Sequence, residues 1–329
     1  MSTTDSTKRA TTADIAREVG VSRATVGFVL NATPGQTISA GTRDKVLAAA
    51  ERLGYRPHLA AQALASGKNR IVLLVLPEWP IEYSMTRHLE EASLVLDAAG
   101  YSLVTMTPHP GGRARPLWQT LQPDVVMGMV PFTDDQLREI RASGVTNVTP
   151  GAEADDTSLD SALFSQGPRL QVDHLVARGR HLLAFASSPD PRLESLVASR
   201  RRVAVNAAEQ ADIHPLSAED VNEENASQVV AEWHAAGING VVAYNDEIAA
   251  LVVGAALRLG LKVPEQLAVV GHDDSPLARL LLPSLSSIHT DNVGLGRYFA
   301  EIALSAAEGR SAPSTAHEPK VTLVHRESS

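Results

Sequence analysis

The chain of 329 residues contains no cysteine. It therefore forms no disulfide and holds no zinc site built on cysteine, which fits a reducing compartment. Aromatic residues make up only 4% of the chain. No apolar stretch approaches the roughly 20 residues that a membrane-spanning helix requires, and the first thirty residues lack the apolar block of a secretory signal. We therefore expect a cytoplasmic protein with no membrane association.

Sequence motifs for chemistry on cofactors are also missing. The chain has no G-x-G-x-x-G and no P-loop, so nucleotide cofactors are not expected. Asp273 and Asp274, with histidines nearby, are the residues that an enzyme would use as acid and base. No nucleophile–base motif and no metal-ligand spacing accompanies them. We expect no catalytic residue, no metal and no cofactor.

Negative charge is in excess, with a net charge of −9, but it is unevenly placed. Residues 1–70 carry ten Lys and Arg against five Asp and Glu, a net charge of +5, and the remainder carries −14. A small basic segment on an acidic body localises attraction for phosphate to that segment. The distribution favours a nucleic-acid partner, with chance asymmetry as the alternative.

Residues 12–31 have the pattern of two short helices. Thr12 is a candidate N-cap with Asp14 in the first turn, and Gly20 is a left-handed stop. Ser22 is a second N-cap. The apolar positions are Ile15, Ala16 and Val19 in the first helix and Val26, Val29 and Leu30 in the second. This pattern predicts a helix-turn-helix whose second helix presents Arg23, Ala24 and Thr25 to the major groove.

A third helix follows. Ser39 is its N-cap, Gly54 its end, and Val46, Ala50 and Leu53 form the apolar stripe. A three-helix bundle without DNA binding has the same caps and stripes, so it remains an alternative. The next stretch, Leu59–Ala65, is only two turns long and marginal alone. We expect it to fold on DNA, with Leu64 wedged into a minor-groove step, or to be a plain linker.

From Ile71 onward, apolar strands alternate with helices. The expected strands are 71–76, 101–106, 124–130, 181–186, 240–244 and 267–270, with helices near 86–99 and 134–143. Continuous apolar strands between helices indicate parallel sheets covered on both faces. Such sheets bind ligands at the carboxyl ends of their strands.

Polar residues follow two of these strands. Asn245-Asp246 comes after 240–244, and Asp273-Asp274 comes after 267–272. The ordinary alternatives are that Asp246 caps the helix 247–259 and that Asp274 caps a loop. Arg200-Arg201-Arg202 is by default a solvated helix face.

The segment Thr12-Ala-Asp-Ile-Ala-Arg-Glu-Val-Gly-Val-Ser-Arg-Ala-Thr-Val-Gly-Phe-Val-Leu-Asn31 resembles the signature of the lactose-repressor (LacI/GalR) family. Leu53-Gly-Tyr-Arg-Pro57 continues it. Gly240–Ala249, Leu261–Ser275 and Pro283–Ile288 resemble further family blocks, so the resemblance covers nearly the whole chain. It weakens between about 107 and 205. Gly27, Phe28 and His58 depart from the usual residues, which leaves the operator sequence open.

The resemblance implies a dimeric repressor that binds a palindromic double-stranded DNA operator. Arg23 and Ala24 would face bases, and Phe28 would meet a thymine methyl or simply pack. Ser22, Thr25, Asn31, Ser39 and Thr42 would touch the DNA backbone, and Ala61 and Leu64 would belong to the minor-groove hinge helix. The predicted DNA-contacting set is Thr11, Ser22, Arg23, Ala24, Thr25, Phe28, Asn31, Ser39, Thr42, Ala61 and Leu64.

The resemblance also implies a periplasmic-binding-protein-like core with two doubly wound parallel-sheet subdomains and three chain crossings. We expect a helix-turn-helix domain at 1–57, a hinge at 58–70, and a core at 71–329. The N-subdomain would hold about 71–164 and 291–309, and the C-subdomain about 165–290 and 310–329. The effector contacts carried over are Arg202, Asn245 and Asp273, with Arg200 as the next candidate. Trp79 and Tyr83 are added from position, with a core role as the alternative.

The expected function is therefore sequence-specific transcriptional regulation by a homodimer, modulated by a small-molecule effector of unknown identity. The sequence leaves open induction or corepression, and a regulator without an effector. A solute-binding protein for transport would share the core fold, but it has no use for residues 12–67. An enzyme is the third class considered.

Overall fold

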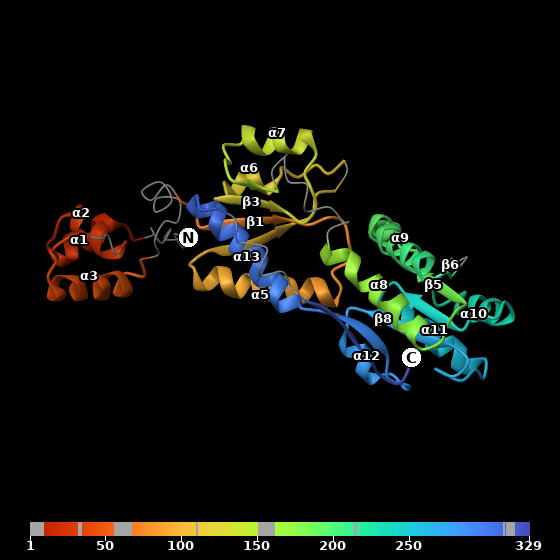
Figure 1. Ribbon diagram of the computed structural model, residues 1–329. Coiled ribbons are helices and arrows are strands. Elements are labelled where there is room, and N and C mark those ends of the chain that lie inside the picture. The colour runs from red at the N-terminus through yellow and green to blue at the C-terminus, as the bar shows by residue number, and fades with distance from the viewer. Residues whose placement is uncertain are drawn as a thin grey trace, which may run out of the picture. The chain divides into compact units, whose positions relative to one another are not determined.

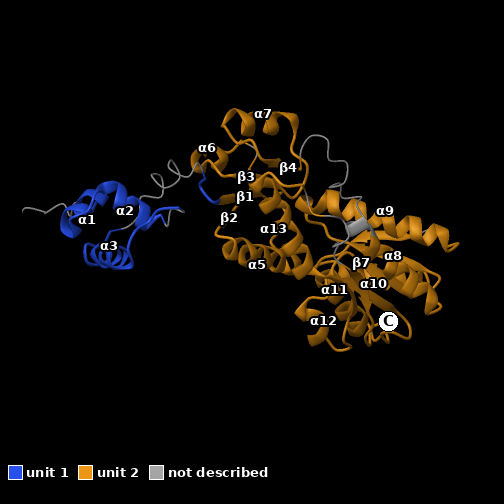
Figure 2. Cartoon of the chain, turned by 60° about the vertical axis from the view of Figure 1, so that its left-hand side comes forward, with its two compact units in different colours: residues 1–70 blue, residues 71–329 orange. Residues whose placement is uncertain are grey.

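The computed structural model describes residues 10–31, 35–55, 68–109, 111–150, 162–213, 216–311, 313 and 320–329. The chain divides into two compact units, residues 1–70 and 71–329, coloured separately in Figure 2. Each unit is described by itself. None of the described helices is both long and apolar enough to cross a membrane.

The described part of the first unit contains three helices, α1 (Thr12–Val19), α2 (Arg23–Leu30) and α3 (Ala40–Arg52). They enclose one small core in which every member is apolar: Ile15, Ala16, Val26, Val29, Val46, Ala49 and Ala50. Gly20 ends α1 at a φ of 75°, which is the left-handed conformation that glycine adopts without a steric penalty. The residues around Gly20 thus form the expected tight connection between α1 and α2.

Two details of this unit differ from the sequence interpretation. The N-cap of α1 is Thr11 and not Thr12, and the Asp14 carboxylate accepts from the Thr11 backbone N–H at 3.0 Å and from its hydroxyl at 2.7 Å. Leu53 is 36% exposed, whereas Ala49 is fully buried. Because α3 ends at Arg52, Leu53 is the C-cap and no longer continues the apolar stripe.

The second unit begins with a parallel sheet in the order β2-β1-β3-β4. Its strands are β1 (Ile71–Val75), β2 (Ser102–Met106), β3 (Val125–Gly128) and β4 (Val148–Thr149). In Figure 1, α5 (Tyr83–Ala98) and α13 (Asn292–Glu308) lie side by side on one face, and α6 (Leu117–Leu121) and α7 (Asp134–Ala142) lie on the other.

The alternation of side chains along β1 explains this layering. Val72 and Leu74 point into the cluster with α5 and α13, whereas Leu73 and Val75 point into the cluster with α6 and α7. Both faces of the strand are therefore buried, which is why its sequence is an uninterrupted apolar run.

A second sheet has the order β10-β9-β8-β7-β5-β6. Its strands are β5 (Leu183–Ser187), β6 (Ser217–Asp220), β7 (Gly240–Ala243), β8 (Ala268–His272), β9 (Ser286–Thr290) and β10 (Val321–Val324). All pairs are parallel except β9 with β10. Four longer helices pack against it: α8 (Ala162–Ala177), α9 (Glu194–Gln210), α10 (Ala226–Ala235) and α11 (Asp246–Arg258). The short elements η2 (Pro191–Leu193) and α12 (Pro276–Leu280) follow strands β5 and β8.

The chain passes between the two sheets three times, as expected. It leaves the first sheet after β4, returns at α13, and goes back to the second sheet with β10. We call the part around the first sheet the first subdomain and the part around the second sheet the second subdomain. The strands β4, β6 and β9 were missed by sequence reasoning. The strand β4 has only two residues, β6 has two exposed acidic residues, and β9 contains a single apolar residue, Ile288.

Candidate DNA-binding face and effector site

Helix α2 divides cleanly into a buried and an exposed face. Val26 and Val29 are buried in the core, while Arg23, Ala24 and Phe28 are exposed on the other face. Apolar packing against α1 and α3 therefore decides which side chains α2 leaves outside. The exposed set contains a guanidinium able to donate two parallel hydrogen bonds, which matches the O6 and N7 acceptors of guanine.

The hydroxyl residues predicted to touch DNA occupy the helix N-termini. Ser22 caps α2 by accepting from the Thr25 backbone N–H at 3.0 Å, and Ser39 caps α3 by accepting from Thr42 at 3.2 Å. Both cap residues remain exposed. A helix N-terminus carries free N–H groups and a partial positive charge that suit a phosphate.

The remaining members of the DNA-contacting set lie as follows. Thr11 is exposed at the N-cap of α1, and Asn31 is exposed at the C-cap of α2. Ala61 and Leu64 lie outside the described residues.

Charge in this unit is partly neutralised. Arg17 pairs with Asp14 at 3.1 Å, and Arg52 pairs with Glu18 at 2.5 Å. Within the described part of the first unit, Arg23, Arg43 and Lys45 form no ion pair, so their charge is available to a polyanion.

Both sheets of the second unit reverse their strand order at one point. The reversal falls between β1 and β3 in the first sheet and between β5 and β7 in the second. Ligands of open α/β sheets bind at the carboxyl ends of the strands at such switch points. Of the predicted effector residues, Asn245 follows β7 at such a switch point, and Asp273 follows the neighbouring strand β8.

Asn245 lies two residues after the last residue of β7 and is 5% exposed. It is the N-cap of α11, because its Oδ1 accepts from the Ile248 backbone N–H at 2.9 Å.

Asp246, the cap considered from the sequence, has a different role. Its carboxylate accepts from the Ser287 hydroxyl and from the Ser275 backbone N–H, and burial raises its pKa to about 6. Asp274, considered as a loop cap, instead pairs with Arg326, whose guanidinium donates at 2.5 Å.

Arg200, and not Arg202, reaches the strand ends. Arg200 is 8% exposed, donates to the Tyr244 carbonyl at 2.6 Å, and lies 3.5 Å from Asp273. Its guanidinium also stacks 4.7 Å from the centroid of the Tyr244 ring. Arg202 is exposed on another side of α9. Of the two arginines considered from the sequence, Arg200 is therefore the one that lies at the strand ends.

Asp273 follows β8 and has a φ of 97°, a backbone conformation that L-residues rarely adopt. Burial alone would raise its pKa, but the Arg200 guanidinium and a 2.9 Å hydrogen bond with His272 outweigh burial and hold the pKa well below its usual range. Burial and Arg200 lower the pKa of His272. The group is thus a buried carboxylate between a cation and a neutral imidazole.

Trp79 and Tyr83 have separate environments. Trp79 is half-buried and packs against the core of the second subdomain, which is the core role kept as the alternative. Tyr83 is 39% exposed at the start of α5.

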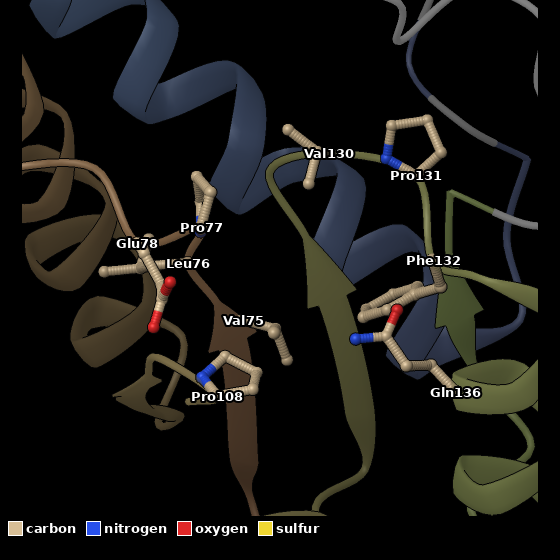
Figure 3. Close-up of a pocket in the computed structure, with 9 residues that line it drawn as sticks. All are labelled: Val75, Leu76, Pro77, Glu78, Pro108, Val130, Pro131, Phe132 and Gln136. Atoms are coloured by element: carbon tan, nitrogen blue, oxygen red, sulfur yellow. The ribbon is translucent and has the colours of Figure 1, made fainter. Parts of the chain in front are cut away.

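A cavity of about 200 Å³ lies at the switch point of the first sheet, shown in Figure 3. It is lined mainly by apolar residues at the ends of β1 and β3: Val75, Leu76, Pro77, Pro108, Val130, Pro131 and Phe132. Glu78 and Gln136 are its polar members. Small-molecule sites are typically apolar with a few placed polar groups, and this cavity has that character.

Sequence reasoning missed three residues near these strand ends. Glu82 accepts a hydrogen bond from Asn245 at 3.3 Å. His88 Nε2 lies 2.7 Å from Asn292 Oδ1, and His272 contacts Asp273 as described above. His272-Asp273 was visible in the sequence as a polar pair after a strand, but nothing in the sequence pairs Glu82 with Asn245, 163 positions away.

A three-helix unit with a solvent-facing second helix, joined to a two-subdomain α/β core with polar strand ends, defines a DNA-binding protein with a ligand-binding type of core. Comparison with known proteins is consistent with each part. The family described as "Bacterial regulatory proteins, lacI family" matches residues 11–58, and the "Periplasmic binding protein-like domain" matches residues 172–329.

Relatives match over nearly the whole chain. The HTH-type transcriptional regulator MalR of Streptomyces coelicolor is 31% identical over 327 residues, covering 92% of this chain and 91% of that protein. The ribose operon repressor of Halalkalibacterium halodurans is 27% identical and covers 95% of each chain. A solved structure of the Lac repressor dimer bound to operator and the anti-inducer ONPF has a TM-score of 0.78 at 24% identity, covering 98% of this chain and 99% of that one.

The chain belongs to the LacI family of DNA-binding transcriptional regulators. Family membership confirms the expected fold class and the regulatory function, and it rules out the enzyme and transport alternatives.

Proposed function

We propose that the protein is a dimeric transcriptional repressor that inserts α2 into the major groove of a palindromic operator. The observation that carries this proposal is the exposed face of α2, where Arg23, Ala24 and Phe28 lie opposite the buried Val26 and Val29. In this arrangement Arg23 and Ala24 read bases, and Phe28 contacts a thymine methyl. Because such an operator is two-fold symmetric, two copies of the chain bind it together. A regulator acts where the chromosome is, so we place the protein in the cytoplasm.

The remaining predicted contacts position the unit on the DNA backbone. Thr11, Ser22, Thr25, Asn31, Ser39 and Thr42 contact phosphates or sugars, and these contacts supply affinity without sequence information. Ala61 and Leu64 are proposed minor-groove contacts of the hinge segment.

The pairing of two copies has a candidate surface in the second subdomain. Leu280, the last residue of α12, and Leu282 are 79% and 83% exposed. Large exposed apolar side chains that lie close together often mark a protein–protein contact. The Lac repressor structure that is similar to this chain is a dimer, which supports the same assembly here.

The effector is proposed to bind at the carboxyl ends of β7 and β8, with Arg200, Asn245 and Asp273 as polar contacts. The cavity at the end of β1 and β3 would take its apolar part, and Tyr83, exposed at the start of α5, is kept as a candidate contact. Binding would favour one closure angle between the subdomains and so change operator affinity. A ligand produces such a change only through different affinities for the two arrangements.

The experiment is a mobility shift on the DNA upstream of the protein's own gene, with the full chain and with a chain lacking residues 1–67. The proposal predicts a discrete shift with the full chain alone. A full chain that shifts no duplex, even at low ionic strength, contradicts it.

A further inference from the structure

The side chain of Glu82 bonds across the two subdomains and does not cap its own helix. Glu82 is the N-cap residue of α5, yet its side chain makes no capping hydrogen bond. Its Oε2 instead accepts from Asn245 Nδ2 at 3.3 Å. Glu82 belongs to the first subdomain and Asn245 to the second, so this bond spans the two.

The orientation of the Asn245 amide is fixed by its own helix. Its oxygen accepts from the Ile248 backbone N–H at the N-terminus of α11, so its NH₂ group has to face the first subdomain. A buried donor that lacks an acceptor costs free energy, and Asn245 is 5% exposed. Glu82 supplies the acceptor.

The same turn of α5 also lies near the neighbouring strand end. The Ser84 side chain contributes to the low pKa of Asp273, and the Ser84 hydroxyl accepts from the Asn292 amide at 3.4 Å. Asn292 begins α13, directly after the chain crosses back to the first subdomain. The first turn of α5 is therefore bonded to Asn245 after β7 and lies near Asp273 after β8.

We propose that Glu82 is a positioning residue that holds the two subdomains at one closure angle by occupying the Asn245 donor with its own carboxylate. This inference rests on the proposed function in one respect, namely that the effector also uses Asn245. An effector that takes this donor has to bring an acceptor oxygen, and it displaces Glu82 in doing so. Competition with Glu82 then gives the ligand different affinities for the two arrangements, which is what regulation requires.

Glu82 holds this contact in an environment that does not favour a carboxylate. Burial and the nearby negative charge of Asp273 raise the pKa of Glu82, and Arg200 and the bond from Asn245 oppose this shift. Within the described residues, no cation forms an ion pair with this carboxylate.

The test exchanges the hydrogen-bond donor and acceptor between residues 82 and 245. Asn245→Asp keeps a side-chain oxygen for the α11 cap, because Asp and Asn cap helices about equally well, but it places two carboxylates face to face. Adding Glu82→Gln supplies an amide donor opposite the new carboxylate and restores the bond in reverse. Glu82→Gln alone keeps an acceptor for Asn245. Glu247→Gln, at an exposed position in the first turn of α11, is the matched control for a change of charge.

Closure is read from the distance between spin labels in the full-length chain. The absence of cysteine allows two labels to be attached through Asp135→Cys in the first subdomain and Glu224→Cys in the second, both at exposed positions. Labelled chain is mixed with excess unlabelled chain, so that each dimer carries one labelled copy.

We expect Asn245→Asp to increase the population of a second distance about tenfold, as the loss of one charge-assisted bond implies. The double variant should return to the distribution of the parent, and the Glu247→Gln control should match the parent. An unchanged distribution for Asn245→Asp, or a double variant that stays displaced, overturns the inference.

If Asn245→Asp does not fold, Glu82→Ala removes the acceptor without touching the cap and has the same expected and contradicting results. Operator binding is measured on the same samples: a parent chain that fails to bind DNA refutes the proposed function and leaves the distance result standing.

Discussion

Gly167 lies so close to His272 that no side chain fits between them. A Cβ atom at residue 167 would be 2.2 Å from Nε2 of His272 and 2.9 Å from its Cδ2. Gly167 is on α8 and His272 ends β8, so the glycine allows the helix to approach the imidazole that contacts Asp273. The helix α8 thereby restricts the His272 ring, which in turn positions the buried carboxylate of Asp273.

Gly167→Ala should therefore disturb the effector site without touching it directly. The added methyl pushes the His272 ring, and with it Asp273 and Arg200, at a cost of about 1–3 kcal/mol in the stability of the second unit. The measurement is urea unfolding followed by tryptophan fluorescence, since all three tryptophans lie in residues 71–329. A variant with parental stability would show that the ring moves freely, against the close approach described here.

Gly27 gives the opposite prediction. It lies inside α2, and a Cβ atom there would meet no neighbour within 4 Å. Gly27→Ala should stabilise the helix by about 0.5–1 kcal/mol, because alanine loses less backbone entropy than glycine. Slower amide exchange in residues 26–31 of the full chain is the expected result, and faster exchange would argue against this environment.

Arg200 and Arg202 should differ sharply in their effect on the core. Removing the Arg200 side chain leaves the Asp273 carboxylate buried with no cation partner among its described neighbours, which costs about 3–5 kcal/mol. Arg202→Ala, at an exposed position of the same helix, should change the free energy of unfolding by no more than about 1 kcal/mol, the usual limit for an exposed polar contact. Equal effects in urea unfolding would mean that Arg200 does not compensate the buried charge of Asp273.

His88 makes the core sensitive to acid. Burial lowers its pKa from 6.5 to about 4, and its Nδ1 is buried without a hydrogen-bond partner among the described residues. Between pH 6.5 and about pH 4, His88 is therefore neutral in the folded state and protonated in the unfolded state. Stability should be constant above about pH 7 and fall as the pH decreases from about 6.5 to 4, by up to about 3 kcal/mol from this group.

The measurement for His88 is the urea midpoint against pH. His88→Gln should flatten the profile, whereas His109→Gln, at a position where the imidazole is 72% exposed, should leave it as in the parent. His174, whose pKa burial also lowers to about 4, should account for part of the remaining slope. A parental profile in His88→Gln would contradict this explanation.

The sequence predicted the features that depend on neighbouring residues. Ser22, Ser39 and Gly20 were identified as helix boundaries because a cap or a left-handed stop is decided within one turn. The buried strands were found from apolar runs. In the same way, Asn245 and Asp273 were placed at strand ends because a strand is followed directly by the loop at its carboxyl end.

The features that the sequence left undetermined depend on tertiary packing. Arg200 and Arg202 are separated by about 200° around α9, and only the packing of that helix on the sheet decides which one points inward. Trp79 was equally suited to a ligand and to a core. The contact of Glu82 with Asn245 joins residues 163 positions apart and needs the folded core to exist.

The most direct test of the central claim is the binding of the full chain to the duplex upstream of its own gene, measured by fluorescence anisotropy across a series of salt concentrations. Arg23→Ala should weaken binding to this duplex by about 1–3 kcal/mol and reduce its preference over unrelated DNA. Arg17→Ala, which removes an exposed cation already paired with Asp14, should leave that preference as in the parent. A chain that binds no duplex at low salt, or an Arg23→Ala variant that retains full preference, would contradict the claim that α2 reads DNA.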